Sequence, residues 1–133
     1  MTRLVSASTF VQVARSPSML FITTAEASMV IVRGDVDLTI TGPLSKQLTE
    51  ELELRPAALI VDLREATFCS SCGLSALARA CEAARRVDVP FAIVTTQHAV
   101  LRPVQLLGLD RTLPIHRTLP EAQEWLGLVN RLR

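Results

Sequence analysis

Hydrophobic residues in this 133-residue chain follow two patterns, short solid runs and repeats with helical spacing. The solid runs are rich in apolar and β-branched residues, and runs without polar alternation are typical of strands covered on both faces. They lie at 19–24, 28–34, 57–63, 91–96 and 113–117. The first two are separated by only a few residues, which predicts a hairpin, and the last and shortest is expected to form an edge strand.

Repeats with helical spacing stand between and after the later strands. Leu44, Leu48 and Leu52 recur every fourth residue, and Gly42 and Pro43 before them predict the start of a helix at that point. Similar stripes predict three more helices, over 74–84, over 98–110 and after a capping box at 118–121.

Strands that alternate with helices predict an α/β domain. We expect a mixed, largely parallel sheet of about four or five strands packed against about four helices. The length fits one domain, expected over residues 18–133. Residues 1–17 are mixed in polarity and end in Pro17, so they are interpreted as an N-terminal extension.

The composition excludes several classes of partner and setting. Fourteen basic and 13 acidic side chains give a net charge of +1, which predicts no strong attraction to nucleic acid or to an anionic membrane surface. No apolar stretch approaches the ~20 residues of a membrane-spanning helix, and the N-terminus lacks the features of a signal peptide. Three cysteines do not make a disulfide framework, so we expect a reduced, cytoplasmic setting.

The segment 68–74, FCSSCGL, raises the main chemical question because it lies between a strand and a helix. Loops at the carboxyl ends of parallel strands commonly carry function. Cys69 and Cys72 have the spacing of a redox pair, and the positive end of a helix dipole would lower the pKa of thiols placed there. The same spacing is half of a zinc site, but no second pair exists, and Cys81 lies on an apolar stripe.

The two serines of this segment offer a different chemistry. A phosphate on Ser70 or Ser71 would be attracted by the helix N-terminus and would add negative charge to the surrounding surface. A surface that binds a protein partner could be switched off in that way. A serine in this place is also expected as the helix N-cap, which is compatible with the switch.

The sequence contains no recognisable set of catalytic residues. His98 and His116 are the only histidines, and neither stands in a nucleophile-elbow, phosphate-loop or metal-ligand motif. Asp35 and Asp37 would share a face if both lay in a strand, but two solvated acids at a strand end are the simpler interpretation. We therefore expect no enzyme activity, no metal and no cofactor.

Three segments in order resemble one known family. The run 58–86 resembles the central segment of the STAS domains of bacterial anti-sigma-factor antagonists, in which an apolar strand ends in Asp-Leu and an Asp-Ser-Ser/Thr-Gly-Leu motif opens a helix. The run 32–48 is similar to the other signature of that family, a Gly-Glu/Asp-x-Asp turn before the first helix. The run 89–126 resembles the closing strand-helix-strand-helix, and the whole resemblance covers 19–128.

The resemblance implies a non-enzymatic switch. A family antagonist binds an anti-sigma factor, usually a GHKL-type serine kinase, and thereby frees a sigma factor. The kinase phosphorylates the Ser or Thr immediately before the motif glycine, and the phosphorylated antagonist no longer binds. Carried over to this sequence, the partner-binding surface would comprise Asp35, Asp37, Ser70, Ser71, Cys72, Gly73 and Leu74.

The sequence departs from the family pattern at the acceptor. Alignment on Gly73 places Cys72 at the phospho-acceptor position and Ser70 where the family has aspartate. Three outcomes follow: constitutive binding without kinase control, which we favour, phosphorylation of Ser71 or Ser70 instead, or thiol chemistry at Cys72. Two other functions stay open, a thiol-disulfide regulator that uses Cys69 and Cys72 and a STAS scaffold or ligand sensor. The oligomeric state, monomer or dimer, is not indicated.

Overall fold

The computed structural model describes residues 10–13, 19–24 and 27–132. Within them the strands are β1 (Phe10–Val13), β2 (Met19–Thr23), β3 (Ser28–Val36), β4 (Leu59–Cys69), β5 (Phe91–Val94) and β6 (Ile115–His116). The helices are α1 (Leu38–Glu53), α2 (Ser71–Arg86), α3 (His98–Leu106) and α4 (Leu119–Leu132), with a 3-10 turn η1 (Leu109–Arg111).

The strands form a single mixed sheet in the order β1-β2-β3-β4-β5-β6. The β1/β2 and β2/β3 pairs are antiparallel, and β3 to β6 are parallel. This confirms the predicted α/β class, the hairpin of β2 and β3, and the edge strand at β6. The pattern did not indicate β1, which falls in the segment interpreted as an extension; the rest of 1–17 lies outside the described residues.

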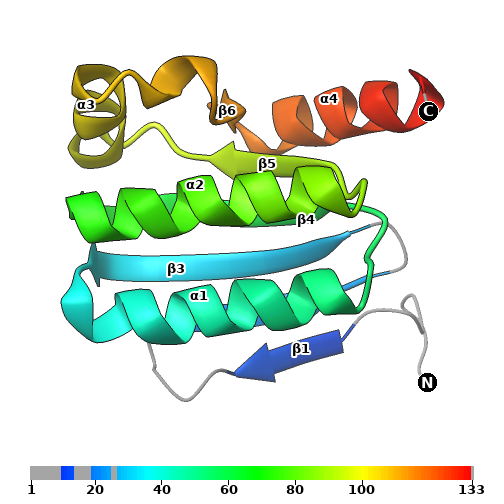
Figure 1. Ribbon diagram of the computed structural model, residues 1–133, viewed down its shortest axis with the longest axis horizontal. Coiled ribbons are helices and arrows are strands. Elements are labelled where there is room, and N and C mark those ends of the chain that lie inside the picture. The colour runs from blue at the N-terminus through cyan, green and yellow to red at the C-terminus, as the bar shows by residue number, and fades with distance from the viewer. Residues whose placement is uncertain (1–9, 14–18, 25–26, 133) are drawn as a thin grey trace.

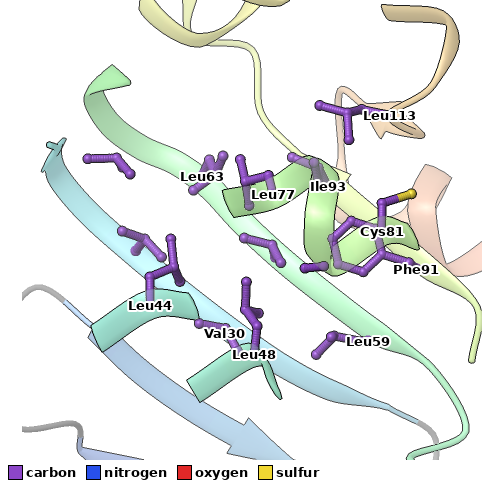
Figure 2. Close-up of a cluster of buried hydrophobic side chains, with 14 of the residues drawn as sticks. Val30, Leu44, Leu48, Leu59, Leu63, Leu77, Cys81, Phe91, Ile93 and Leu113 are labelled. Carbon is purple, nitrogen blue, oxygen red and sulfur yellow. The ribbon is translucent and has the colours of Figure 1, made fainter. Parts of the chain in front are cut away.

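The helices form a layer on each face of the sheet. Helices α1 and α2 lie side by side over one face, as Figure 1 shows, and bury their leucine stripes on β3, β4 and β5. Leu44 and Leu48 from α1 meet Leu77 from α2 in this core (Figure 2). Helix α4 covers the opposite face of β4 and β5 through Ala122 and Leu126. Strands β4 and β5 are therefore covered on both faces, which explains their solid apolar runs.

Helix α1 begins at Leu38, and the predicted start at Gly42 and Pro43 is wrong. Asp37 caps the helix, because its side chain accepts hydrogen bonds from the Thr39 N–H at 3.0 Å and the Thr39 hydroxyl at 2.6 Å. These bonds satisfy groups at the helix end, so an extra turn forms ahead of Pro43. That turn carries Leu38 to the edge of the sheet where β3 ends.

Strand β4 extends to Cys69, well past the apolar run at 57–63. Its second half pairs with β3 across two register shifts, with Asp35 opposite Phe68 and Val36 opposite Cys69. The expected loop before α2 is therefore a single residue, Ser70, which separates the strand from the helix.

Candidate functional site

The ends of β3 and β4 bring the two signature segments together. The backbone N–H of Ser70 donates a hydrogen bond of 2.9 Å to the carbonyl oxygen of Val36. Helices α1 and α2 both start next to this bond, at the left edge of the view in Figure 1, where β3 ends. Residues 35–38 and 68–72 consequently form one edge of the molecule.

Ser70 is the N-cap of α2, as expected for a serine at this place. Its hydroxyl oxygen accepts a hydrogen bond of 3.1 Å from the Gly73 N–H, and its carbonyl oxygen accepts the Leu74 N–H at 3.0 Å. The side chain of Ser70 is half-buried. Its hydroxyl therefore already has a structural role in holding the first turn of the helix.

Ser71 and Cys72 are exposed in the first turn of α2. Within the part of the chain that the structure describes, neither side chain makes a hydrogen bond. Both stand at the positive end of the helix dipole. They are the reactive side chains of this segment that a partner could reach.

Gly73 and Leu74 lie beneath this surface. A Cβ added to Gly73 would stand 2.8 Å from Val36 Cγ1, 3.2 Å from the Val36 carbonyl oxygen and 3.2 Å from Cys69 Sγ. The glycine therefore lets α2 approach the end of β3. Leu74 is fully buried in the core. Of the predicted partner-binding residues, these two position the surface from below.

Asp35 and Asp37 have separate hydrogen-bond partners. Asp35 lies in β3 and accepts a hydrogen bond of 2.9 Å from the Thr67 hydroxyl of β4. Asp37 lies beyond the strand, and the hydrogen bonds from the Thr39 hydroxyl and N–H lower the pKa of its carboxyl group. The shared strand face that their spacing suggested is not formed, because β3 ends at Val36.

The cysteines of the segment face different environments. Cys69 is only 2% exposed, and burial raises the pKa of its thiol to about 11. This is opposite in sign to the effect expected from the helix dipole, because Cys69 ends β4 and lies in the core. Cys72 is exposed, and Cys69, Cys72 and Cys81 are all free thiols. Cys81 is a core residue, as its place on the apolar stripe predicted.

The sequence reasoning missed two exposed apolar side chains beside this segment. Leu38 is 76% exposed at the start of α1, and Phe68 is 48% exposed near the end of β4. The signal for Leu38 was the pattern Asp-Leu-Thr, a helix cap followed by the first helical residue. No sequence signal marks Phe68, because Thr67 and Phe68 are both exposed and this end of β4 does not alternate.

A half-buried ion pair in β4 joins Asp62 to Arg64. Asp62 is buried, and its carboxylate accepts hydrogen bonds from Arg64 Nε at 2.9 Å and Nη2 at 2.7 Å. Those bonds raise the pKa of the Arg64 guanidinium. The carbonyl oxygen of Arg64 accepts the Gln97 side-chain amide at 2.8 Å, which ties β4 to the start of α3.

The described residues form no second candidate site for catalysis or metal binding. Among those residues no three His, Cys, Asp or Glu side chains gather in a metal-binding arrangement. His98 begins α3, whereas His116 stacks against Trp125 with ring centroids 5.3 Å apart. Burial lowers the pKa of His116. No helix of the described chain has the length and apolar character to cross a membrane.

Comparison with known proteins agrees with this architecture. The family model of the STAS domain matches residues 19–122. The chain belongs to the STAS-domain family. The resemblance recognised in the sequence is thereby confirmed.

Relatives of this STAS protein carry the name of anti-sigma factor antagonists. The anti-sigma-F factor antagonist RsfB of Mycobacterium tuberculosis is 30% identical over 110 residues, which cover 80% of this chain and 89% of RsfB. The anti-sigma-F factor antagonist RsfA of the same species is 28% identical over 72% of this chain and 77% of its own length. An anti-sigma factor antagonist from Mycobacterium paratuberculosis has a solved structure with a TM-score of 0.73 and 27% identity, covering 92% of this chain and 98% of that one.

Proposed function

We propose that this protein is an anti-sigma-factor antagonist, which binds an anti-sigma factor and thereby releases a sigma factor. The names of its relatives support this proposal, as does their coverage of nearly the whole chain. The partner we propose is a GHKL-type serine kinase, as the family resemblance implies. The protein then acts in the cytoplasm as a binding switch with no catalytic role of its own.

The binding surface we propose is the edge formed by residues 35–38 and 68–72. It presents the apolar side chains of Leu38 and Phe68 among the carboxylates and hydroxyls of its neighbours. Apolar side chains surrounded by a polar rim are the usual composition of a protein-binding patch. Both side chains come from positions that the strand and helix ends fix rigidly.

Cys72 is the observation that supports a form of control different from the family pattern. It stands exposed immediately before Gly73, at the place where the family resemblance implies the phospho-acceptor. A thiol is not the acceptor group of a serine kinase, and the hydroxyl oxygen of Ser70 is engaged in the helix cap. We therefore propose that the protein keeps binding its partner while the kinase is supplied with ATP.

Ser71 is the second candidate for regulation because it is the exposed hydroxyl of the segment. It points roughly 100° around the helix axis from Cys72. A kinase site built for the position of Cys72 would have to accept this different direction. Phosphorylation of Ser71 would therefore be slower than that of a serine placed at position 72.

The thiol-disulfide alternative has less support. Pairing Cys69 with Cys72 would require the sulfur of Cys69 to leave the core, where it lies beside Gly73. Its raised pKa, about 11, also keeps it protonated and unreactive near neutral pH.

Incubation with the kinase and ATP, followed by intact-mass measurement, tests the proposal. The wild type is expected to stay unmodified, whereas Cys72→Ser gains the mass of one phosphate and then loses affinity for the kinase. Cys72→Ala is the matched control and should stay unmodified. A phosphate on the wild type that disappears in Ser71→Ala would move the site to Ser71 and contradict constitutive binding.

A further inference from the structure

A hollow runs between the first two turns of α1 and α2, which lie side by side in Figure 1. Its volume is about 380 Å³. The residues that matter in its lining are Leu38, Gly42, Ser71, Cys72, Ser75 and Arg79. We call this hollow the α1–α2 groove. It opens at the edge proposed above to bind the partner and continues away from that edge along α2.

Several small residues leave space between the two helices. Gly42 has no side chain, and a Cβ added there would find no atom from another part of the fold within 4 Å. Ser71 and Ser75 face it from successive turns of α2. The helices themselves are held at close distance by leucines on their buried faces. The space above those leucines is thus left free for a side chain from outside.

The two ends of the groove differ in chemistry. Leu38 stands at the open end with 76% of its surface exposed. Arg79 stands at the far end, exposed, and makes no ion pair within the described part of the chain. By contrast, Arg33, Arg64, Arg85 and Arg86 all lie beside carboxylates. The named lining therefore carries one formal charge, a guanidinium without a counterion.

We infer that the α1–α2 groove receives a segment of the anti-sigma factor that carries an apolar side chain and a carboxylate. The apolar side chain packs on Leu38 and over Gly42, and the carboxylate pairs with Arg79. Ser71 and Arg79 are separated by ~12 Å along the helix, which sets the distance between the two partner groups. A planar guanidinium binds a carboxylate through two parallel hydrogen bonds, so this end of the groove adds specificity.

This inference rests on the proposed function and adds a consequence for regulation. Ser71 lines the groove, so a phosphate attached to it would add close to two negative charges at the end of the groove that holds the apolar side chain of the partner. The phosphate would also occupy the space of the apolar side chain. The loss of this apolar contact thus explains how a modification at Ser71 would weaken binding.

Affinity measurement by calorimetry tests the groove, with the full-length protein and the purified anti-sigma kinase of the same organism. Arg79→Glu places a like charge at the partner carboxylate and is expected to weaken binding by roughly a hundredfold, and Arg79→Ala by about tenfold. Arg55→Glu is the matched control, because it makes the same charge change after the far end of α1 and should bind as the wild type.

Gly42→Leu provides a second test that does not depend on charge. The new side chain meets no atom outside its own helix, so the protein should remain folded, as checked by circular dichroism, while binding falls by at least tenfold. Wild-type affinity in both Arg79→Glu and Gly42→Leu would overturn the groove and leave the proposed function standing. A wild type that binds no anti-sigma kinase would overturn both.

Discussion

Ser70 donates its backbone N–H to the carbonyl oxygen of Val36 at 2.9 Å, and this bond fixes the start of α2 against the end of β3. The bond spans two segments that are far apart in the chain. It makes the candidate binding edge a rigid junction of strand ends and helix starts, with Ser70 as the only residue between β4 and α2.

Substitution of Gly73 tests how tightly this junction is packed. Gly73→Ala places a Cβ 2.8 Å from Val36 Cγ1 and 3.2 Å from its carbonyl oxygen, so α2 must shift. We expect a loss of about 1–3 kcal/mol in the free energy of unfolding, measured by urea denaturation. Gly42→Ala is the control, because its Cβ meets no atom outside its own helix. The helix preference of alanine is opposed by the β-carbon standing directly before Pro43, so stability should change by less than ~1 kcal/mol. Equal effects of the two variants would contradict the packing described.

The cap of α2 can be tested separately from its packing. Ser70→Ala removes the oxygen that accepts the Gly73 N–H and should lower the free energy of unfolding by ~1 kcal/mol. Ser70→Asp keeps an acceptor at the N-cap and should retain wild-type stability within ~0.5 kcal/mol. Ser71→Ala, at an exposed position with no hydrogen bond, should also change stability by less than ~0.5 kcal/mol. A destabilised Ser70→Asp would show that the hydroxyl has another role.

The buried thiol of Cys69 predicts how stability depends on alkaline pH. Its pKa is raised from 9.0 to about 11 in the folded protein, so above about pH 9 the unfolded chain loses a proton that the folded chain keeps. The contribution is therefore complete below about pH 9 and is lost as the pH rises toward 11. We expect part of the wild-type loss in the free energy of unfolding between these pH values to be absent in Cys69→Ala. Ser71→Ala, which removes no titratable group, should keep the wild-type slope, and identical slopes in all three proteins would contradict the assignment.

Part of the fold could be predicted because strands that are buried on both faces, such as β4 and β5, have continuous apolar sequences. The start of α1 could not be predicted. Proline is most common in the first turn of a helix, so Pro43 indicated a start that is too late in the sequence. The stripe of Leu44, Leu48 and Leu52 continues backwards to Ile40, which is also buried and would have indicated the earlier start. The second half of β4 lacks a continuous apolar sequence, because only Ala66 and Cys69 in this half are buried.

The candidate site was predictable in part for similar reasons. A serine before a helix predicts an N-cap, and Ser70 is one. The sequence did not indicate that Cys69 is buried and Cys72 exposed. The boundary between β4 and α2 lies between these two cysteines, and the sequence pattern did not locate it. Exposed apolar residues such as Phe68 cannot be recognised from a single sequence, since the default place of phenylalanine is the core. Their exposure had to come from the register of β3 with β4.

Phe68 and Leu38 supply the remaining prediction, the apolar contacts of the binding edge. Phe68→Ala and Leu38→Ala should each weaken binding to the anti-sigma kinase by roughly 30-fold, because a buried anchor at an interface contributes about 2 kcal/mol. Both side chains are exposed in the free protein, so the free energy of unfolding should change by less than ~0.5 kcal/mol.

Leu54→Ala is the matched control for these variants. Leu54 is 73% exposed, but it follows the far end of α1, away from the edge formed by residues 35–38 and 68–72. Its removal should leave the affinity unchanged, since an exposed leucine outside the interface loses no partner contact. If all three alanine variants bound equally well, the kinase would have to dock on another face. If only Leu54→Ala bound poorly, that face would lie at the opposite end of the helix.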